Sequence, residues 1–183
     1  MATKNMFLED YSFKGEYAKR VEDLVGIIDK NSGAKVFDSV IELFITAAVV
    51  GCYKNIVAEP IKSSEITKKI FATQFTTHND DLKLVFRLVL LTAQKESIDE
   101  VTRLNRAFRN PETDENYSLF EKYMLGGVKY LHDKFFVESN HKYEDYLGSL
   151  VELISEYKKE EDKISANDII GGNDLVSTEE FDF

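Results

Sequence analysis

The sequence of 183 residues has no tryptophan, two prolines and a single cysteine. Because Cys52 has no second cysteine to pair with, a disulfide scaffold is excluded, and a reducing, cytoplasmic compartment is favoured. The densest apolar run, Val40–Tyr53, contains Glu42 and is shorter than the roughly 20 residues that a membrane-spanning helix needs. The N-terminal stretch also lacks the apolar core of a secretory signal. We therefore expect a cytoplasmic protein with no membrane partner.

Motifs for metals and nucleotides are absent as well. The three histidines, His78, His132 and His141, lie far apart, without an HExxH motif or a cysteine pair. The only loose grouping joins His132 and His141 with Asp133 and Glu138, and we interpret it as an ordinary polar surface. No GxxxxGK[ST] or GxGxxG motif occurs, so nucleotide hydrolysis is not supported. The sequence predicts no cofactor, no metal and no catalytic residue, and an enzyme is expected only if its site is dispersed.

The net charge of −10 is unevenly distributed along the chain. Residues 1–109 hold sixteen Lys and Arg against fifteen Asp and Glu, whereas residues 110–183 hold seven against eighteen. Phosphate binding requires positive charge, so the acidic second part argues against wrapping of nucleic acid by the whole chain. Any nucleic-acid contact is expected in the first part.

Apolar periodicity predicts helices through most of the chain. The stretch Val36–Asn55 is apolar almost all round and starts with a possible capping box of Ser39 and Glu42, so we expect a buried central helix there. Gly126 and Gly127 lie inside a predicted helix and indicate close helix contact or a kink. Further helices are expected over residues 16–29, 64–76, 79–95, 97–109, 115–136 and 141–159, with a strand left open for 64–76. The predicted fold is all-α: one helical domain of six or seven helices over residues 1–160, followed by an acidic tail over 161–183.

The predicted helix 97–109 carries the candidate DNA-binding residues. Its apolar positions, which we expect to face inward, are Ile98, Val101, Leu104 and Phe108. Arg103, Arg106 and Arg109 recur at three-residue spacing on the opposite side, where they can contact phosphates. The lysines that can extend this basic patch are Lys54, Lys62, Lys68 and Lys69. The alternative is that these cations serve only solubility and ion pairing.

The C-terminal end is the candidate partner-binding segment, because its acidic residues are interleaved with aromatic ones. It consists of Glu179, Glu180, Phe181, Asp182 and Phe183. A terminal Phe can fill an apolar pocket while its carboxylate meets a basic rim, and this end resembles the Phe-terminated tips by which bacterial single-stranded-DNA-binding proteins recruit partners. The alternatives are a solubilising tail, and a tail that screens the arginine face of its own body.

Two stretches, VFDSVIELFITAAVVGCYKN at 36–55 and LFEKYMLGGVKYL at 119–131, resemble small helical accessory proteins associated with bacterial DNA phosphorothioation and phage-defence gene clusters. The chain differs at Lys54-Asn55, where a basic pair would be expected. The resemblance implies association with a DNA-modifying or defence system and assigns no catalytic residue.

The hypothesis is a non-enzymatic accessory protein that binds protein partners and, through its arginines, DNA. The alternative is an adaptor that acts through its tail. An apolar helix face also allows a homo-oligomer.

Overall fold

The computed structural model describes residues 5–137 and 146–159. The chain divides into two compact units, Met1–Glu138 and Ser139–Phe183. In the second unit the described part is one helix, 146–159, which agrees with the C-terminal portion of the predicted helix 141–159. The predicted acidic tail lies outside the described residues.

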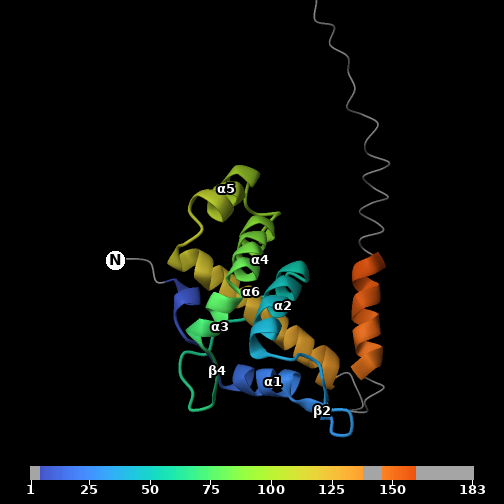
Figure 1. Ribbon diagram of the computed structural model, residues 1–183. Helices are drawn as coiled ribbons and strands as arrows, with labels where there is room; N and C mark the ends of the chain where they lie inside the picture. Colours follow the sequence, from blue (N-terminus) through green and yellow to red (C-terminus); the bar gives the residue numbers. More distant parts are fainter. Residues whose placement is uncertain (1–4, 138–145, 160–183) are drawn as a thin grey trace, which may run out of the picture. The chain divides into compact units, whose positions relative to one another are not determined.

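The first unit is mostly helical (Figure 1). Its α-helices are α1 (Glu16–Val25), α2 (Val40–Tyr53), α3 (Ala72–Thr77), α4 (Asn79–Thr92), α5 (Glu100–Leu104) and α6 (Asp114–His132). Shorter helical segments are the 3-10 helix η1 (Met6–Leu8) and the π-helices η2 (Asn105–Arg109) and η3 (Asp133–Val137). The strands are β1 (Tyr11–Lys14), β2 (Ile27–Asp29), β3 (Ala34–Lys35) and β4 (Thr67–Ile70). Within the described ranges, no helix has the length and apolar character needed to cross a bilayer.

The prediction of a purely all-α fold is wrong, because the strands form two antiparallel pairs, β1 with β4 and β2 with β3. The expected helix 64–76 is replaced by β4 and the short helix α3, so the strand left open for that stretch is confirmed over 67–70. Pairing with β1 buries Ile70 and Phe13, and a burial of this kind depends on a partner far away in the sequence. The expected helix 16–29 likewise ends at Val25, before β2.

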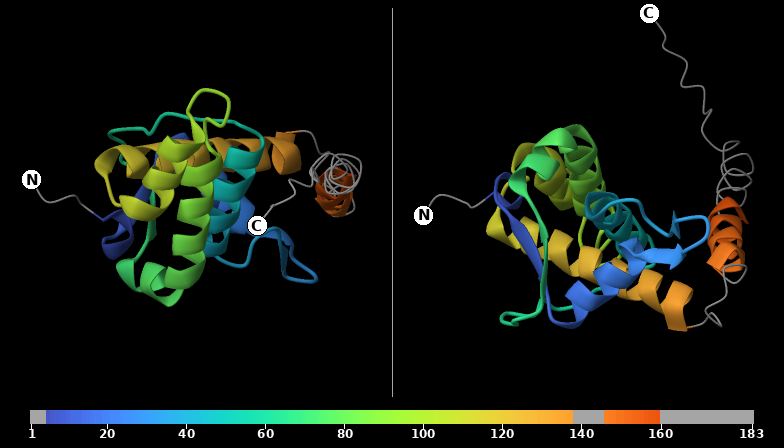
Figure 2. Two further views of the ribbon diagram at one scale, coloured as in Figure 1. Left: turned by 90° about the horizontal axis from the view of Figure 1, so that it is seen from above. Right: turned by 60° about the horizontal axis from the view of Figure 1, so that its bottom comes forward.

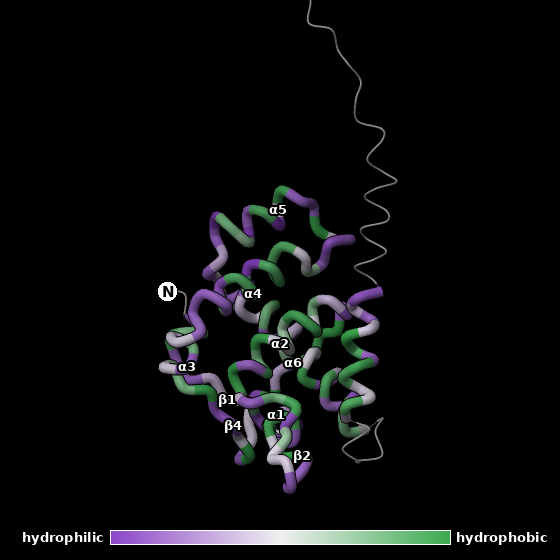
Figure 3. Tube along the Cα trace, turned by 45° about the vertical axis from the view of Figure 1, so that its right-hand side comes forward, coloured by the Kyte–Doolittle hydropathy of each residue, from purple (hydrophilic) through white to green (hydrophobic). Residues whose placement is uncertain are grey.

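The buried central helix is confirmed, as α2. Ser39 accepts a hydrogen bond from the Glu42 amide at 3.3 Å, which caps the helix start as expected. The α2 trace is hydrophobic along most of its length (Figure 3), and Leu43 and Phe44 are fully buried. Neighbouring elements therefore cover α2 on several sides, as its apolar circumference requires.

Helices α2 and α6 pack backbone to backbone where they cross (Figures 1 and 2). A Cβ added to Gly51 of α2 would collide with the Tyr123 carbonyl oxygen of α6. A Cβ added to Gly127 would collide with the Ala47 carbonyl oxygen of α2. The close helix contact predicted from the glycine pair is therefore confirmed.

A cluster of aromatic rings attaches the N-terminal segment to the helices. The Phe7 ring of η1 lies edge-on to four others at centroid distances of 5.5 to 5.8 Å: Phe75, Phe86, Tyr117 and Phe120. Edge-to-face contacts of this kind add about 0.5–1.5 kcal/mol each to the burial of the rings. The cluster holds η1 against α3, α4 and α6.

Candidate functional site

The Arg106 side chain caps the C-terminal end of α4. Its Nε and Nη2 donate hydrogen bonds to the Leu90 carbonyl oxygen at 3.2 and 2.9 Å, and Nη2 also donates to the Ala93 carbonyl oxygen at 3.2 Å. Nη1 donates to the Gln94 Oε1 atom at 3.1 Å. The last carbonyls of a helix have no partner within the helix, and a cation there also complements the helix dipole. Burial lowers the pKa of Arg106 below its usual value.

Arg103 makes the same kind of contact, because its Nη1 donates to the Leu91 carbonyl oxygen at 3.0 Å. Arg109 differs from both, since it is exposed at the end of η2. Two of the three predicted DNA-contacting arginines are thus directed at the protein's own backbone. Arg109 is the one that points toward solvent, and its contact with DNA stays a prediction.

Two of the predicted lysines lie far from the arginines. Lys68 and Lys69 lie on β4, and Figure 1 shows β4 and α5 at opposite ends of the first unit. Lys62 precedes β4, and its carbonyl oxygen accepts a hydrogen bond from the Lys14 Nζ at 2.9 Å. The Lys54 Nζ lies 5.2 Å and 5.8 Å from the ring centroids of two tyrosines, Tyr53 and Tyr130. The predicted partner-binding residues Glu179, Glu180, Phe181, Asp182 and Phe183 lie outside the described residues.

The apolar side of α5 and η2 faces solvent, which overturns the prediction that it faces inward. Val101 and Phe108 are 66% and 56% exposed, and Leu104 is also exposed. The arginines occupy the inner side instead, because the α4 carbonyls there need donors. The helix also starts later than expected, with Asp99 rather than Ser97 as its N-cap.

The exposed apolar side chains of η2 and α4 line a groove of about 390 Å³, which we call the α4–η2 groove. Its lining residues are Asp80, Lys83, Leu84, Arg87, Leu88, Leu91 and Phe108. Leu84 is 68% exposed, and such an apolar surface on a small protein commonly marks a binding site. The sequence feature that could have indicated this groove is the run LKLVFRLVLL, whose apolar residues occupy more than one face of α4.

A second site that the sequence did not reveal lies between β1 and α6. Here the Tyr11 hydroxyl donates a hydrogen bond to the Glu121 Oε1 atom at 2.9 Å, across 110 residues of sequence. Both side chains line two pockets, of about 420 Å³ and about 330 Å³. Lys14 and Tyr17 also line the first of these pockets. Burial is the main cause that raises the pKa of Tyr11 and that of Glu121. No local pattern links residues so distant.

A carboxyl group with a raised pKa can serve as a general acid or base when it reaches a substrate proton. Here Glu121 of α6 accepts a hydrogen bond from Tyr11, which belongs to strand β1. We interpret the pair as a tie between β1 and α6.

Replacing Tyr11 by phenylalanine is expected to lower the free energy of unfolding by about 2 kcal/mol at pH 8. The hydrogen bond from Tyr11 lowers the pKa of Glu121 against the effect of burial, so its loss raises that pKa further. A raised pKa in the folded state means that stability falls as the pH rises through it. The destabilisation should therefore be smaller at pH 4.5 than at pH 8, because protonation of Glu121 removes the carboxylate charge that the Tyr11 hydroxyl stabilises.

Urea unfolding at the two pH values measures this difference. Tyr17→Phe is the matched control, because the Tyr17 hydroxyl donates to the Glu59 carbonyl oxygen at 3.3 Å rather than to a titratable group. An equal loss for Tyr11→Phe at both pH values would show that the pair is not coupled to the charge of Glu121.

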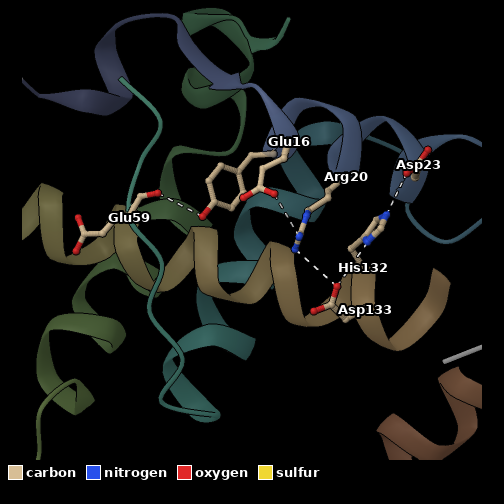
Figure 4. A network of polar contacts seen from close by, with 7 residues as sticks. Glu16, Arg20, Asp23, Glu59, His132 and Asp133 are labelled. Carbon is tan, nitrogen blue, oxygen red and sulfur yellow. Dashed lines mark hydrogen bonds and ion pairs between the residues drawn. The ribbon is translucent and has the colours of Figure 1, made fainter. Parts of the chain in front are cut away.

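A polar network ties α1 to the end of α6 (Figure 4). The Arg20 guanidinium lies 3.6 Å from the Glu16 carboxylate and 3.7 Å from the Asp133 carboxylate. The His132 Nε2 lies 3.0 Å from the Asp23 carboxylate. These contacts join charged and polar groups of α1, α6 and η3 and involve no nucleophile, so we interpret the network as structural.

His132 and Asp133 also belong to the loose metal-ligand grouping considered from the sequence. The other two members, Glu138 and His141, lie outside the described residues. Among residues 5–137 and 146–159, no three His, Cys, Asp or Glu side chains are grouped so that they could hold a metal ion. His132 instead stacks on Phe136, with ring centroids 5.2 Å apart.

The candidate site with the clearest binding character is therefore the α4–η2 groove. No protein-family model, curated protein or solved structure matches this chain.

Proposed function

We propose that this chain is a non-enzymatic accessory protein that binds a protein partner on the surface formed by α4, α5 and η2. The observation that carries the proposal is the exposure of Val101, Leu104 and Phe108, of which Phe108 lines the α4–η2 groove together with the exposed Leu84. Exposing these side chains to water costs free energy, roughly 25 cal/mol per Å² of apolar surface that a partner would bury. Apolar surfaces with a polar rim are the usual core of protein–protein interfaces.

The biological setting of the proposal is a bacterial DNA-modification or phage-defence complex. Its support is the resemblance of residues 36–55 and 119–131 to accessory proteins of such systems. A DNA contact within that complex would use Arg109, which is exposed beside Phe108 and so lies at the edge of the proposed protein-binding surface. Arg103 and Arg106 would support this contact indirectly, because they hold α5 and η2 on α4.

Site-specific photocrosslinking in the cells that produce the protein tests the proposed surface. A photoreactive residue at Leu84 is expected to give one discrete crosslinked product, and a further substitution, Leu88→Glu, should remove it. The control position is Ile27, which is 59% exposed but lies on β2, at the other end of the unit from α5 (Figure 1). Equal crosslinking at both positions, or none at Leu84, would contradict a specific interface.

The alternative function is an adaptor that captures its partner with the acidic, Phe-terminated tail. The feature that favours it is the sequence Glu179–Phe183, in which two aromatic residues alternate with acidic ones. In that case a photoreactive residue at Phe181 would crosslink to the partner, and Leu84 would not.

A further inference from the structure

The α4–η2 groove has the length of a short helix. Its floor follows one side of α4 from Asp80 to Leu91, a rise of roughly 16 Å at 1.5 Å per residue, and Phe108 lines it from η2. A partner helix of roughly three turns has the same length. Because an α-helix is roughly 10 Å across, a groove of about 390 Å³ receives one side of such a helix and leaves the other side in water.

The leucines of the groove have the spacing of a seam between two helices. Leu84, Leu88 and Leu91 line it at intervals of four and three residues. In paired helices, apolar side chains at these alternating intervals insert between the side chains of the facing helix. Leu84 and Leu88 are exposed, so nothing among residues 5–137 covers this part of the seam. The surface of α4 is thus suited to a further helix.

The backbone of α4 favours a helical partner segment over an extended one. Residues inside a helix use their N–H and C=O groups in the hydrogen bonds of that helix. The carbonyl oxygens of Leu90 and Leu91 near its end accept hydrogen bonds from Arg106 and Arg103. An extended peptide would therefore bring backbone donors and acceptors to a surface that has no backbone groups left to pair with them. A helical segment satisfies its own backbone groups and contacts the groove through side chains alone.

The charged residues of the groove favour an acidic partner segment. Lys83 and Arg87 line it one helical turn apart, so they follow the same side of α4. Both are exposed, and within residues 5–137 and 146–159 neither forms an ion pair. Asp80 also lines the groove, but it lies in the first turn of α4, where its charge complements the helix dipole. Two carboxylates one turn apart on a partner helix can therefore meet the two cations.

A second copy of the chain matches these charges poorly. If two copies packed antiparallel with Leu84 of one against Leu88 of the other, the twofold axis would be level with the midpoint between these residues. Arg87 is one residue from that level, so the two Arg87 side chains would lie on the same side of the pair, at heights roughly 3 Å apart. Like charges brought together in an interface weaken it. The groove therefore favours a separate acidic partner over this dimer.

We propose that the α4–η2 groove binds an acidic amphipathic helix of a partner protein. The apolar side of that helix packs against Leu84, Leu88 and Phe108, and its carboxylates meet Lys83 and Arg87. The apolar contacts supply the buried surface, and the two cations select the sign of the partner's charge. This assignment rests on the proposed function and adds the chemistry of the partner segment to it.

Fluorescence anisotropy with designed helical peptides tests the assignment on the full-length protein. The probe is a peptide of about fifteen residues, held helical by a side-chain crosslink, with leucines at intervals of four and three and glutamates beside them. The wild-type chain should bind it about tenfold more tightly than the same peptide with lysines in place of the glutamates. This preference should shrink as the salt concentration rises, because exposed charges are screened.

Two variants separate the contributions of charge and apolar surface. Lys83→Glu/Arg87→Glu should reverse the preference, so that the lysine peptide binds more tightly than the glutamate peptide. Leu84→Ala/Leu88→Ala should weaken the binding of the glutamate peptide about tenfold, because it removes the apolar contacts. Ile27→Ala is the matched control, since Ile27 is also exposed but lies on β2, and it should leave the affinity unchanged.

No binding of the glutamate peptide, equal binding of the two peptides, or an unchanged preference in the charge-reversed variant would overturn the assignment. Equal binding of an uncrosslinked glutamate peptide with a central proline, which breaks a helix, would overturn the helical partner. A wild-type dimer that Leu84→Ala/Leu88→Ala dissociates would overturn the assignment in favour of a second copy.

Photocrosslinking at Leu84 distinguishes a failure of this assignment from a failure of the proposed function. A crosslinked partner together with equal binding of the two peptides would overturn the assignment and leave the proposed function standing. The expected peptide preference without any crosslinked partner would overturn the proposed function and support only the chemistry of the groove.

Discussion

Replacing Gly127 by alanine is expected to lower the free energy of unfolding by about 3 kcal/mol or more, because the new methyl group has no room at the crossing of α2 and α6. Its Cβ would overlap the Ala47 carbonyl oxygen, and the neighbouring atoms belong to the Ala47 backbone as well. A flexible side chain can turn away from a methyl group, whereas a helical backbone moves only with the whole helix. Gly51→Ala should have a comparable effect, because its Cβ would overlap the Tyr123 carbonyl oxygen.

Urea unfolding followed by circular dichroism measures this loss. The matched control is Gly148→Ala in the helix 146–159, where no described atom lies within 4 Å of the added Cβ. There alanine should stabilise the helix by about 0.5–1 kcal/mol, through helix propensity alone. Wild-type stability of the Gly127→Ala protein would mean that α2 and α6 do not pack backbone to backbone.

The elements that could be predicted well are those whose stability depends on residues close together in the sequence. Helix α2 shows its cap at Ser39 and an apolar circumference, and the Gly126-Gly127 pair in α6 indicates the close contact that the structure contains. Strand β4 was left only as an alternative, because what stabilises it is β1, more than fifty residues earlier in the sequence. Local periodicity carries no information on such a partner.

The orientation of residues 97–109 in the candidate site could not be predicted for the same reason, because it depends on a contact between two separate segments. The apolar and basic sides of residues 97–109 were recognised, but their orientation was inverted, since an amphipathic helix usually buries its apolar side. The free carbonyls at the end of α4 decide the orientation, and they are satisfied by Arg103 and Arg106. That requirement arises only when α4 and α5 are adjacent in space. The apolar side is then left to face solvent, and its Phe108 lines the α4–η2 groove.

Replacing Arg106 by alanine is expected to lower the free energy of unfolding by about 2–3 kcal/mol. The guanidinium group donates three hydrogen bonds to the carbonyl oxygens of Leu90 and Ala93. A hydrogen bond from a charged donor contributes about 1.5–3 kcal/mol, and in the variant water can bind the carbonyl oxygens in place of part of these bonds. Arg106→Lys should restore only part of the loss, because an ammonium group lacks the planar fork that reaches both carbonyls. Chemical unfolding of the three proteins measures the difference.

Arg109→Ala is the control for this prediction, since Arg109 is exposed and its removal should change stability by less than about 0.5 kcal/mol. The comparison also distinguishes a direct contact of an arginine with DNA from a structural role of an arginine in the fold. A loss of DNA retention with Arg109→Ala at unchanged stability would indicate a phosphate contact, whereas a loss with Arg106→Ala that follows unfolding would indicate only a missing cap. If Arg106→Ala were as harmless to stability as Arg109→Ala, the two arginines would be equivalent surface cations, and the orientation of α5 on α4 would need another cause.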